Sequence, residues 1–315
     1  MRAQDDNVSA LAAIHTSPKP WVELLSWKPR AFLYHNFVSP AECQHIIQEA
    51  KPMMRRSTVI GEAGSSIQDS IRTSYGTFLL RRHDSAIARM EDRLAAWTQL
   101  PMTHQEDLQV LRYSQGEKYG PHYDSVQGEA LKGRSPRIAT VIVYLNEDAT
   151  LQGGETAFTQ APGIGGIKGL SACADGFVAV KPRRGDALLF YTLKPDSSQD
   201  DASIHTGCPV LQGVKWTATK WIHTEPFHPE WLSEKMDTSN ALLPENCTDT
   251  ELACPAWAAS GECSKNREYM VGDDVVLGQC RASCQECEPC ASSDRACHMR
   301  NRARAGFLAL PDGED

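Results

Sequence analysis

The clearest indication of the fold class is the segment Lys215-Trp216-Thr217-Ala218-Thr219-Lys220-Trp221-Ile222-His223. Threonine and tryptophan are frequent in strands, where successive side chains point to opposite faces. One face would carry Lys215, Thr217, Thr219, Trp221 and His223, and the other Trp216, Ala218 and Ile222. The segment therefore predicts a strand with one mostly polar face and one face suited to packing in a core.

Upstream segments show the same period of two and are rich in β-branched and aromatic residues. These predicted strands are Leu108–Ser114, Arg137–Leu145, Phe177–Pro182 and Asp186–Tyr191. Before them, Ser39-Pro40-Ala41-Glu42 is a helix start, with serine as N-cap and proline at the first position, and a second helix begins near Asp84. Helices followed by many strands predict an α+β fold in which an antiparallel sandwich or barrel has helices packed on one side.

Length and charge narrow the classes of function. The chain has 315 residues, 41% of them hydrophobic, and a formal net charge of -8. This length fits one domain of about 200 residues and a smaller module. The negative charge gives no electrostatic basis for nucleic acid as the main partner. The longest apolar run, Ile138 to Leu145, is too short to cross a bilayer.

The cysteines are unevenly distributed along the chain. Three of them, Cys43, Cys173 and Cys208, precede residue 240, whereas eight lie between Cys247 and Cys297. Such a density predicts a disulfide scaffold and an oxidising compartment, namely the lumen of the endoplasmic reticulum or Golgi apparatus. Glycosylation sequons at Asn7 and Asn246 are compatible with that location. No leader or membrane anchor is recognisable, and we expect a leader to be missing from this sequence.

The first chemical motif is His122-Tyr123-Asp124. Residues two apart on a strand share a face, so this imidazole and carboxylate would converge. His205, just before the last long strand, could supply a second imidazole. Two histidines and one carboxylate hold non-haem Fe(II) and leave positions open for a bidentate co-substrate and O2. A histidine two residues from an aspartate also arises by chance, so this motif alone is weak.

Lys215 is the second chemical feature. A lysine on an inward strand face is costly unless it is paired with an anion. A dicarboxylate that chelates a metal at one end could supply that anion at the other. The alternative is that Lys215 is an exposed strand residue.

Longer stretches resemble the plant and algal type of prolyl 4-hydroxylase, which is related to the catalytic domain of the animal collagen enzymes. The matching segments are Leu25–Arg30, Ile71–Leu79, Leu108–Tyr113, Lys118–Asp124, Arg137–Thr140, Gly153–Thr156, Gly185–Phe190, His205–Val210 and Gly213–Trp216. The resemblance covers residues 18–228. It implies a double-stranded β-helix, or jelly-roll, core with supporting N-terminal helices.

The resemblance also implies roles for individual residues. It makes His122, Asp124 and His205 the iron ligands, and Lys215, Tyr113, Thr156 and Trp221 the residues that hold 2-oxoglutarate. Arg72, Ser74, Glu106, Tyr119, Arg137 and His223 match positions associated with the peptide groove, and Arg134 is an alternative to Arg137.

The implied activity is a procollagen-proline-type 4-dioxygenase. It would hydroxylate C4 of peptidyl proline with Fe(II), 2-oxoglutarate and O2, release succinate and CO2, and use L-ascorbate to restore oxidised iron. The expected substrate is a proline-rich segment in polyproline II form. The alternatives are a 2-oxoglutarate dioxygenase acting on lysine or on a non-peptide, and a catalytically dead binding module.

The C-terminal cysteines resemble the sea-anemone-toxin-like (ShKT) domain. That resemblance implies the disulfides Cys247-Cys287, Cys254-Cys280 and Cys263-Cys284. Cys290 could pair with Cys297. Cys43 could pair with Cys208, although free buried thiols are an equal alternative for Cys43 and Cys208. Cys173 is expected to be unpaired. Zinc at Cys284, Cys287 and Cys290 is a competing interpretation. The predicted organisation is a flexible arm (1–20), the dioxygenase domain (21–228), a linker (229–246), the ShKT-like domain (247–287) and a polar, frayed tail (288–315).

Overall fold

The computed structural model describes residues 19–60, 66–67, 69–125, 135–145, 150–228, 244–272 and 277–309. Its centre is an antiparallel sheet of eight strands. In spatial order these are β1 (Trp21–Trp27), β2 (Arg30–His35), β13 (Ala187–Tyr191), β9 (Arg137–Tyr144), β16 (Lys215–His223), β7 (Leu108–Tyr113), β6 (Tyr75–Leu79) and β3 (Arg55–Arg56). All the strands predicted from the sequence are therefore present, each within two residues of its expected ends.

A smaller antiparallel sheet faces the large one. Its strands, in spatial order, are β12 (Phe177–Val180), β11 (Thr156–Pro162), β14 (His205–Gly207) and β8 (Tyr119–His122). Two short strand pairs complete the β structure: β10 (Gln152–Gly153) with β15 (Val210–Gln212), and β4 (Val59–Ile60) with β5 (Ser66–Ile67). Two facing antiparallel sheets with a shared core are consistent with the expected jelly-roll core.

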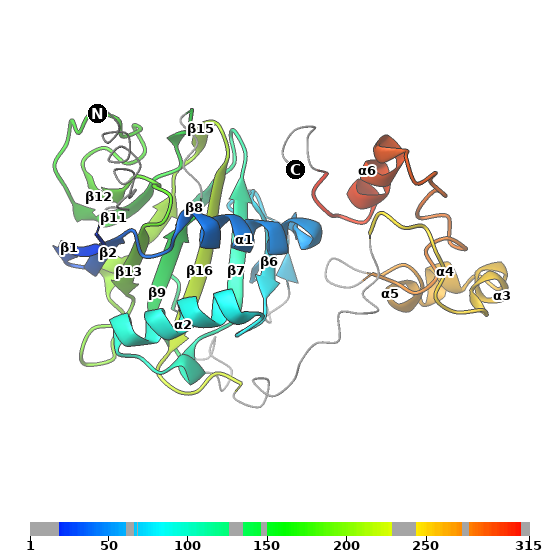
Figure 1. The fold of residues 1–315 in the computed structure, drawn as a ribbon, viewed down its shortest axis with the longest axis horizontal. Helices are drawn as coiled ribbons and strands as arrows, with labels where there is room; N and C mark the ends of the chain where they lie inside the picture. Colours follow the sequence, from blue (N-terminus) through cyan, green and yellow to red (C-terminus); the bar gives the residue numbers. More distant parts are fainter. Residues whose placement is uncertain are drawn as a thin grey trace, which may run out of the picture.

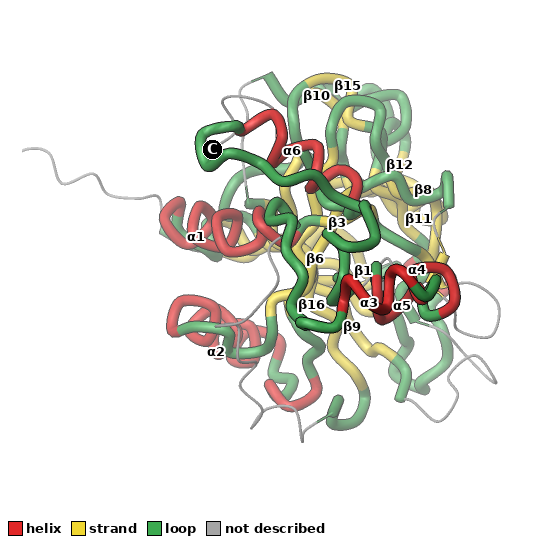
Figure 2. Tube along the Cα trace, turned by 90° about the vertical axis from the view of Figure 1, so that its right-hand side faces the viewer, coloured by secondary structure: helices red, strands yellow, loops and turns green. Residues whose placement is uncertain are grey.

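Two helices cover the outer face of the large sheet (Figure 1). Helix α1 (Pro40–Ala50) has the predicted capping box between Ser39 and Glu42, and α2 (Ser85–Thr98) is capped by Asp84. Figure 2 shows both helices on one side of the sheet and β8, β11 and β12 on the other. Short 3-10 helices lie at Lys51–Met53, Met102–His104 and Asp201–Ser203.

The sheet separates two hydrophobic cores. The core under the helices joins α1 and α2 to strand residues that include Trp216, Ala218 and Ile222 of β16, as the alternation predicted. The core between the two sheets includes Phe158 and Phe190. Burial on both sides fixes the register of β16, since a shift by one residue would exchange its packing and polar faces.

One residue on the packing face of β16 is charged. Lys220 is fully buried, and its ammonium lies 2.6 Å from the equally buried carboxylate of Glu91 in α2. It also donates a hydrogen bond to the backbone carbonyl of Glu106. The pair holds α2 against the sheet, because a buried charge without its counter-charge would destabilise this core.

Breaking this pair is expected to destabilise the fold. Lys220→Met should lower the free energy of unfolding by about 3–5 kcal/mol, because it leaves the Glu91 carboxylate buried without a counter-charge. Urea denaturation followed by circular dichroism would measure the loss. The double variant Lys220→Met/Glu91→Leu should recover much of it, and a single variant as stable as the parent chain would contradict the prediction.

The C-terminal module contains three short helices, α3 (Cys254–Ala259), α4 (Glu262–Lys265) and α5 (Arg267–Met270). Its disulfides are Cys247–Cys287, Cys254–Cys280, Cys263–Cys284 and Cys290–Cys297. The first three pairings are those implied by the resemblance. Because Cys284, Cys287 and Cys290 are all disulfide-bonded, the competing zinc interpretation is wrong.

The three cysteines that precede residue 240 depart from two expectations. Cys173 is bonded to Cys208, and Cys43 is a buried free thiol. The expected unpaired Cys173 and the possible Cys43–Cys208 bond are therefore both wrong. Cys43 points from α1 into the helix-side core, whereas Cys208 packs with Ala157 and Ala174 around the smaller sheet.

The predicted frayed tail is instead ordered over much of its length. Helix α6 (Arg295–Arg304) contains Cys297 of the last disulfide, and Leu308 joins the core under α1 and α2. The backbone amide of Leu308 donates to the carbonyl of Met54 at 2.8 Å, and Arg302 Nη2 donates to the carbonyl of Pro52 at 2.9 Å. The end of the chain thus packs against the segment that follows α1.

Several other predictions fall outside the described residues, namely most of the arm at 1–20, most of the linker at 229–246, Asn7 and Arg134. Among the described helices, none is both long enough and apolar enough to cross a membrane.

Candidate active site

Strand pairing brings the two predicted metal-binding histidines together. His122 ends β8, His205 begins β14, and the two residues lie directly opposite each other in the antiparallel pair. Asp124 follows β8, with its Oδ1 3.4 Å from His122 Nε2 and its Oδ2 3.7 Å from His205 Nε2. One ligand atom from each residue lies within 4.8 Å of the others, a spacing compatible with one shared ion.

Hydrogen bonds orient each of these side chains. Nδ1 of His122 lies 2.8 Å from the carbonyl of Gly120, and Nδ1 of His205 lies 3.0 Å from the carbonyl of Ser203. These contacts place the proton on Nδ1 and leave Nε2 of each ring free to bind a metal. The hydroxyl of Thr140 donates to Asp124 Oδ2 at 2.6 Å, which fixes the carboxylate.

The site also sets the protonation states that metal binding requires. Burial, together with the charge of His122, lowers the pKa of His205 to about 4, so its imidazole is neutral at pH 7. Burial alone would raise the pKa of Asp124, but the adjacent His205 and His122 hold it well below its usual range. The neutral imidazole of His205 and the carboxylate of Asp124, together with the imidazole of His122, make a donor set that fits Fe(II) in a facial triad.

Lys215 lies in the same pocket as this triad. It begins β16 and is only 4% exposed, so the alternative of an exposed strand residue is wrong. Burial lowers the pKa of Lys215 to about 8, opposed in part by the charge of Glu155. Within the described part of the chain, no carboxylate lies within 4.0 Å of its ammonium, whose neighbours include the rings of Tyr113 at 5.3 Å and Tyr144 at 5.8 Å. A buried cation in this position is suited to binding an anionic ligand.

The other predicted co-substrate residues also line this pocket. Tyr113 lies opposite Lys215 across the β7–β16 pair. Thr156, at the start of β11, accepts a hydrogen bond from the hydroxyl of Tyr144 at 2.9 Å. The buried indole nitrogen of Trp221 has no hydrogen-bond acceptor in the described part of the chain. The structure therefore brings these residues and the triad around one space.

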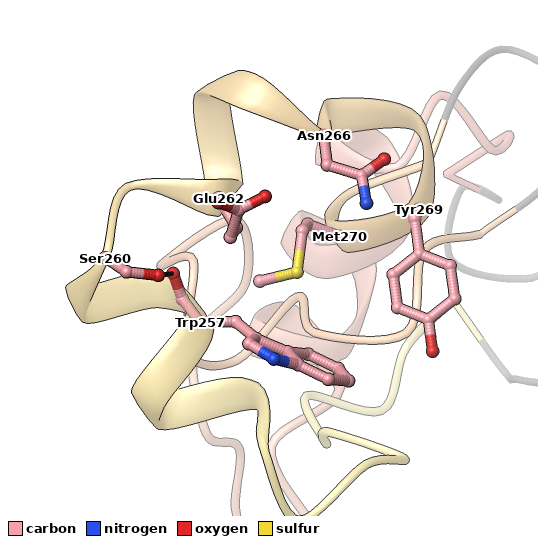
Figure 3. Close-up of a pocket in the computed structure, with 6 residues that line it drawn as sticks. All are labelled: Trp257, Ser260, Glu262, Asn266, Tyr269 and Met270. Carbon is pink, nitrogen blue, oxygen red and sulfur yellow. Dashed lines mark hydrogen bonds between the residues drawn. The ribbon is translucent and has the colours of Figure 1, made fainter.

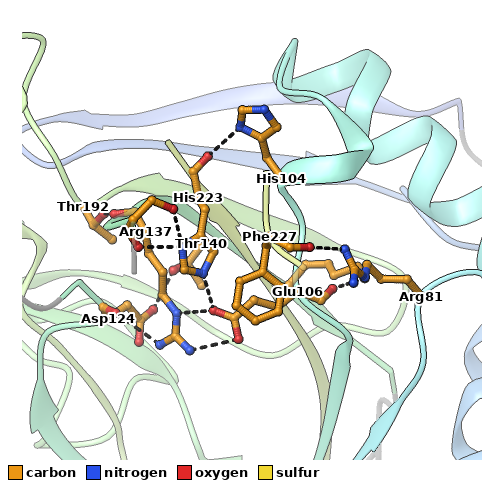
Figure 4. A network of polar contacts seen from close by, with 11 residues as sticks. Arg81, His104, Glu106, Asp124, Arg137, Thr140, Thr192, His223 and Phe227 are labelled. Atoms are coloured by element: carbon orange, nitrogen blue, oxygen red, sulfur yellow. Dashed lines mark hydrogen bonds and ion pairs between the residues drawn. The ribbon is translucent and has the colours of Figure 1, made fainter. Parts of the chain in front are cut away.

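Three of the predicted groove residues form one polar network (Figure 4). Glu106 accepts from Arg137 Nε at 2.5 Å and lies 2.8 Å from His223 Nε2. Burial alone would raise the pKa of Glu106, but Arg137 and His223 hold it at about 2. Arg137 also donates to the backbone carbonyl of Asp124 at 3.2 Å and lies 3.9 Å above the ring of Trp221. The network thus joins the triad to the last strand.

The other three predicted groove residues are placed differently from one another. Arg72 and Tyr119 line the pocket, with the guanidinium 4.6 Å from the tyrosine ring centre. The Tyr119 ring is stacked on His122, 3.6 Å between centroids. Ser74 is fully buried, donates to the hydroxyl of Ser57 at 3.0 Å, and is not among the residues that line the pocket.

Several residues of the site were not predicted from the sequence. Gln109 and Ile142 line the pocket, and Thr140 orients Asp124. Alternation along the predicted strand at 137–145 puts Thr140 and Ile142 on the same face. A threonine on that inward face was the signal in the sequence that could have identified Thr140. Glu155 is fully buried and binds both the amide and the hydroxyl of Ser171 at 2.8 Å. No local pattern in the sequence marked that contact.

Comparison with known proteins agrees with this geometry. The 2OG-Fe(II) oxygenase superfamily matches residues 108–223, which contain the triad and Lys215. Prolyl 4-hydroxylase 2 of Arabidopsis thaliana is 43% identical over 274 residues, covering 84% of this chain and 88% of that protein. Prolyl 4-hydroxylase 5 of the same plant is 46% identical over 213 residues, covering 66% of this chain and 72% of that protein.

A solved structure of the viral collagen prolyl hydroxylase from Paramecium Bursaria Chlorella virus-1, in complex with 2OG, is 24% identical, with a TM-score of 0.47 over 62% of this chain and 96% of that one. The assignment depends on the sequence identity with the plant proteins and not on this structural likeness. On that basis the chain belongs to the prolyl 4-hydroxylase family of 2-oxoglutarate-dependent, Fe(II)-dependent dioxygenases.

Proposed function

We propose that this protein hydroxylates C4 of proline residues in proline-rich peptides, using Fe(II), 2-oxoglutarate and O2. The observation that carries the proposal is the placement of a buried ammonium, Lys215, in the same pocket as the free Nε2 atoms of His122 and His205. A metal at one end and a cation at the other match the two ends of a keto-diacid.

Each part of the pocket has a separate task in this proposal. His122, Asp124 and His205 would hold the iron, which with 2-oxoglutarate supplies the chemistry that puts one oxygen atom of O2 on C4 and the other into succinate, with loss of CO2. Lys215 binds the distal carboxylate of the co-substrate, and Tyr113 and Thr156 offer hydroxyls beside it. The burial of these side chains keeps water from competing for the same charges.

The substrate enters on the side of Tyr119 and Arg72. Tyr119 lines the pocket and is stacked on the ligand His122, so its ring lies beside the metal site. An aromatic ring at this point suits the pyrrolidine ring of a proline, and a polyproline II segment needs little further ordering on binding. Arg137, Glu106 and His223 act as positioning residues, because they hold the backbone carbonyl of Asp124 and the ring of Trp221. L-Ascorbate restores the iron after turnovers that do not oxidise a substrate.

We assign residues 21–228 to the dioxygenase domain and 247–287 to an ShKT-like domain. The second assignment is supported by the three disulfides whose pairing matches that resemblance. The disulfides also support passage through the lumen of the endoplasmic reticulum or Golgi apparatus, since such bonds persist in oxidising compartments.

Mass spectrometry of a proline-rich peptide tests the proposal. After incubation with the protein, Fe(II), 2-oxoglutarate and ascorbate, we expect a gain of one oxygen atom per modified proline, located at C4 by comparison with 4-hydroxyproline standards. A matched peptide with alanine in place of proline should stay unmodified. Oxygen on lysine instead of proline, or succinate formation that no proline peptide stimulates, would contradict the proposal.

A further inference from the structure

The C-terminal module contains a pocket of its own, distant in sequence from the active site (Figure 3). Its volume is about 440 Å³, and it is lined by Trp257, Ser260, Glu262, Asn266, Tyr269 and Met270. Helices α3, α4 and α5 carry four of these residues, and Ser260 and Asn266 cap their ends. The disulfides Cys254–Cys280 and Cys263–Cys284 hold these helices. The pocket is therefore part of a cross-linked scaffold.

Apolar surface in this pocket comes mainly from two rings and a thioether. Trp257 and Tyr269 are 6.0 Å apart between centroids, with their planes at 73°, and Tyr269 is 43% exposed. Met270 is buried and lies between them and the opposite rim (Figure 3). Two rings set at a steep angle form a notch for a compact, non-aromatic ring, such as the pyrrolidine ring of proline.

The polar groups of the pocket include hydrogen-bond donors that are unused in the described part of the chain. The indole nitrogen of Trp257, the amide of Asn266 and the hydroxyl of Tyr269 make no hydrogen bond there. An indole N–H can only donate. A ligand that fits must therefore present acceptors. The carboxylate of Glu262 stands on the same rim and disfavours an anionic ligand.

A polyproline II segment has these properties. Proline has no backbone N–H, and the carbonyls of a polyproline II helix make no internal hydrogen bonds, so they are free to accept. Its rings project outward, it is uncharged, and it is already ordered before binding. We propose that this pocket is a second binding site for the polyproline II segments of the substrate, separate from the active site. The inference rests on the proposed function for the identity of the ligand.

A second site on the same chain would favour long substrates over short ones. Once one part of a long peptide is bound in the C-terminal pocket, other parts are held near the active site at a raised effective concentration. A short peptide can occupy only one site at a time and gains nothing. The pocket would therefore change the KM of long substrates and leave kcat and the KM of short ones unchanged.

Variants of the full chain test this inference. The substrates are two proline-rich peptides, one of about 6 residues and one of about 40, which at about 3.1 Å per residue spans about 120 Å. We expect Tyr269→Ala to raise the KM of the long peptide about 10-fold, the loss typical for removal of an aromatic anchor. The KM of the short peptide and the kcat of both should not change. Trp257→Leu should act in the same way and serves as a second variant with a different risk of misfolding.

Leu252→Ala is the matched control, because Leu252 is a fully exposed apolar residue of the same module and does not line the pocket. It should leave both KM values unchanged. Equal effects of Tyr269→Ala on short and long peptides, or none from either pocket variant, would overturn the inference.

Binding measured without turnover separates this inference from the proposed function. Fluorescence anisotropy of the labelled long peptide, with the full chain and no iron or 2-oxoglutarate, should show weaker binding for Tyr269→Ala and Trp257→Leu than for Leu252→Ala. Equal affinities would overturn the second site even if prolines are hydroxylated. Binding of an oligosaccharide to this pocket, with none of the peptide, would also overturn it. If no peptide is hydroxylated by the parent chain, the proposed function fails, and the anisotropy result still decides whether the pocket binds polyproline.

Discussion

His205→Ala is expected to abolish proline hydroxylation. Loss of a partner in the outer shell of a metal site typically costs 10- to 100-fold in metal affinity or activity, and loss of a direct ligand should cost more, so we expect turnover to fall more than about 100-fold. The imidazole is buried between Asp124 and the ring of Phe190, where water cannot easily replace it as a ligand. Iron content after dialysis and the rate of succinate formation measure the two effects.

The control for this prediction is His83→Ala. His83 pairs with Glu49 at the surface beside α1 and α2, away from the pocket, and its removal should leave iron content and turnover near those of the parent chain. Circular dichroism of both variants checks that they fold. A folded His205→Ala protein that kept its iron and its activity would show that the ion is bound elsewhere.

Lys215→Ala should weaken 2-oxoglutarate far more than the peptide substrate. Removing one partner of a buried, hydrogen-bonded charge pair costs about 2–5 kcal/mol, which corresponds to a rise of about 30- to 5,000-fold in the KM for 2-oxoglutarate. The KM for the peptide should change little, because no part of the proposed peptide path depends on this ammonium. Initial rates at varied co-substrate and varied peptide separate the two constants, and an unchanged KM for 2-oxoglutarate would remove Lys215 from its assigned role.

The pH dependence gives an independent check on the same side chain. Lys215 has a pKa of about 8 in the folded protein, against about 10.4 in an unfolded chain. The affinity for 2-oxoglutarate should therefore fall as pH rises above about 8, since the free protein then loses the required charge. Without co-substrate, the buried charge costs about 3 kcal/mol below pH 8, and this cost disappears as pH rises from 8 to 10.4. Lys215→Met should accordingly raise the unfolding temperature at pH 7, the opposite of Lys220→Met.

Alternation in the sequence was sufficient to predict much of the catalytic part. It placed Trp216 and Ala218 in the core and Lys215 on the other face, because β16 is covered on both sides and its period of two is regular. The smaller sheet was harder to predict. The strand Thr156–Pro162 contains Gln160 and Pro162, and the strand at His205 is only three residues long, so neither shows a clear period. Both are defined by pairing between distant segments.

Other features could not be predicted from the sequence because they depend on contacts between residues far apart along the chain. The buried pair of Lys220 and Glu91 joins residues from a strand and a helix, and nothing local to either residue indicates the other. The bond between Cys173 and Cys208 depends on the path of the loop between β11 and β12, which contains Gly163, Gly165 and Gly166 and shows no regular period. Ser74 matches the family pattern and is fully buried, and its burial could not be predicted, since a sequence match reports identity and not orientation.

The packing of Leu308 and Arg302 against the segment after α1 has a consequence for engineering the enzyme. A chain cut after the last strand would lose more than its cysteine-rich portion: it would uncover Met54, which is otherwise fully buried, and open the apolar layer beneath α1 to solvent. Shortened versions should therefore be prone to aggregation, and weak activity in them would report a damaged scaffold and not a lost substrate contact. Point changes in the intact polypeptide are the appropriate way to dissect what each half contributes.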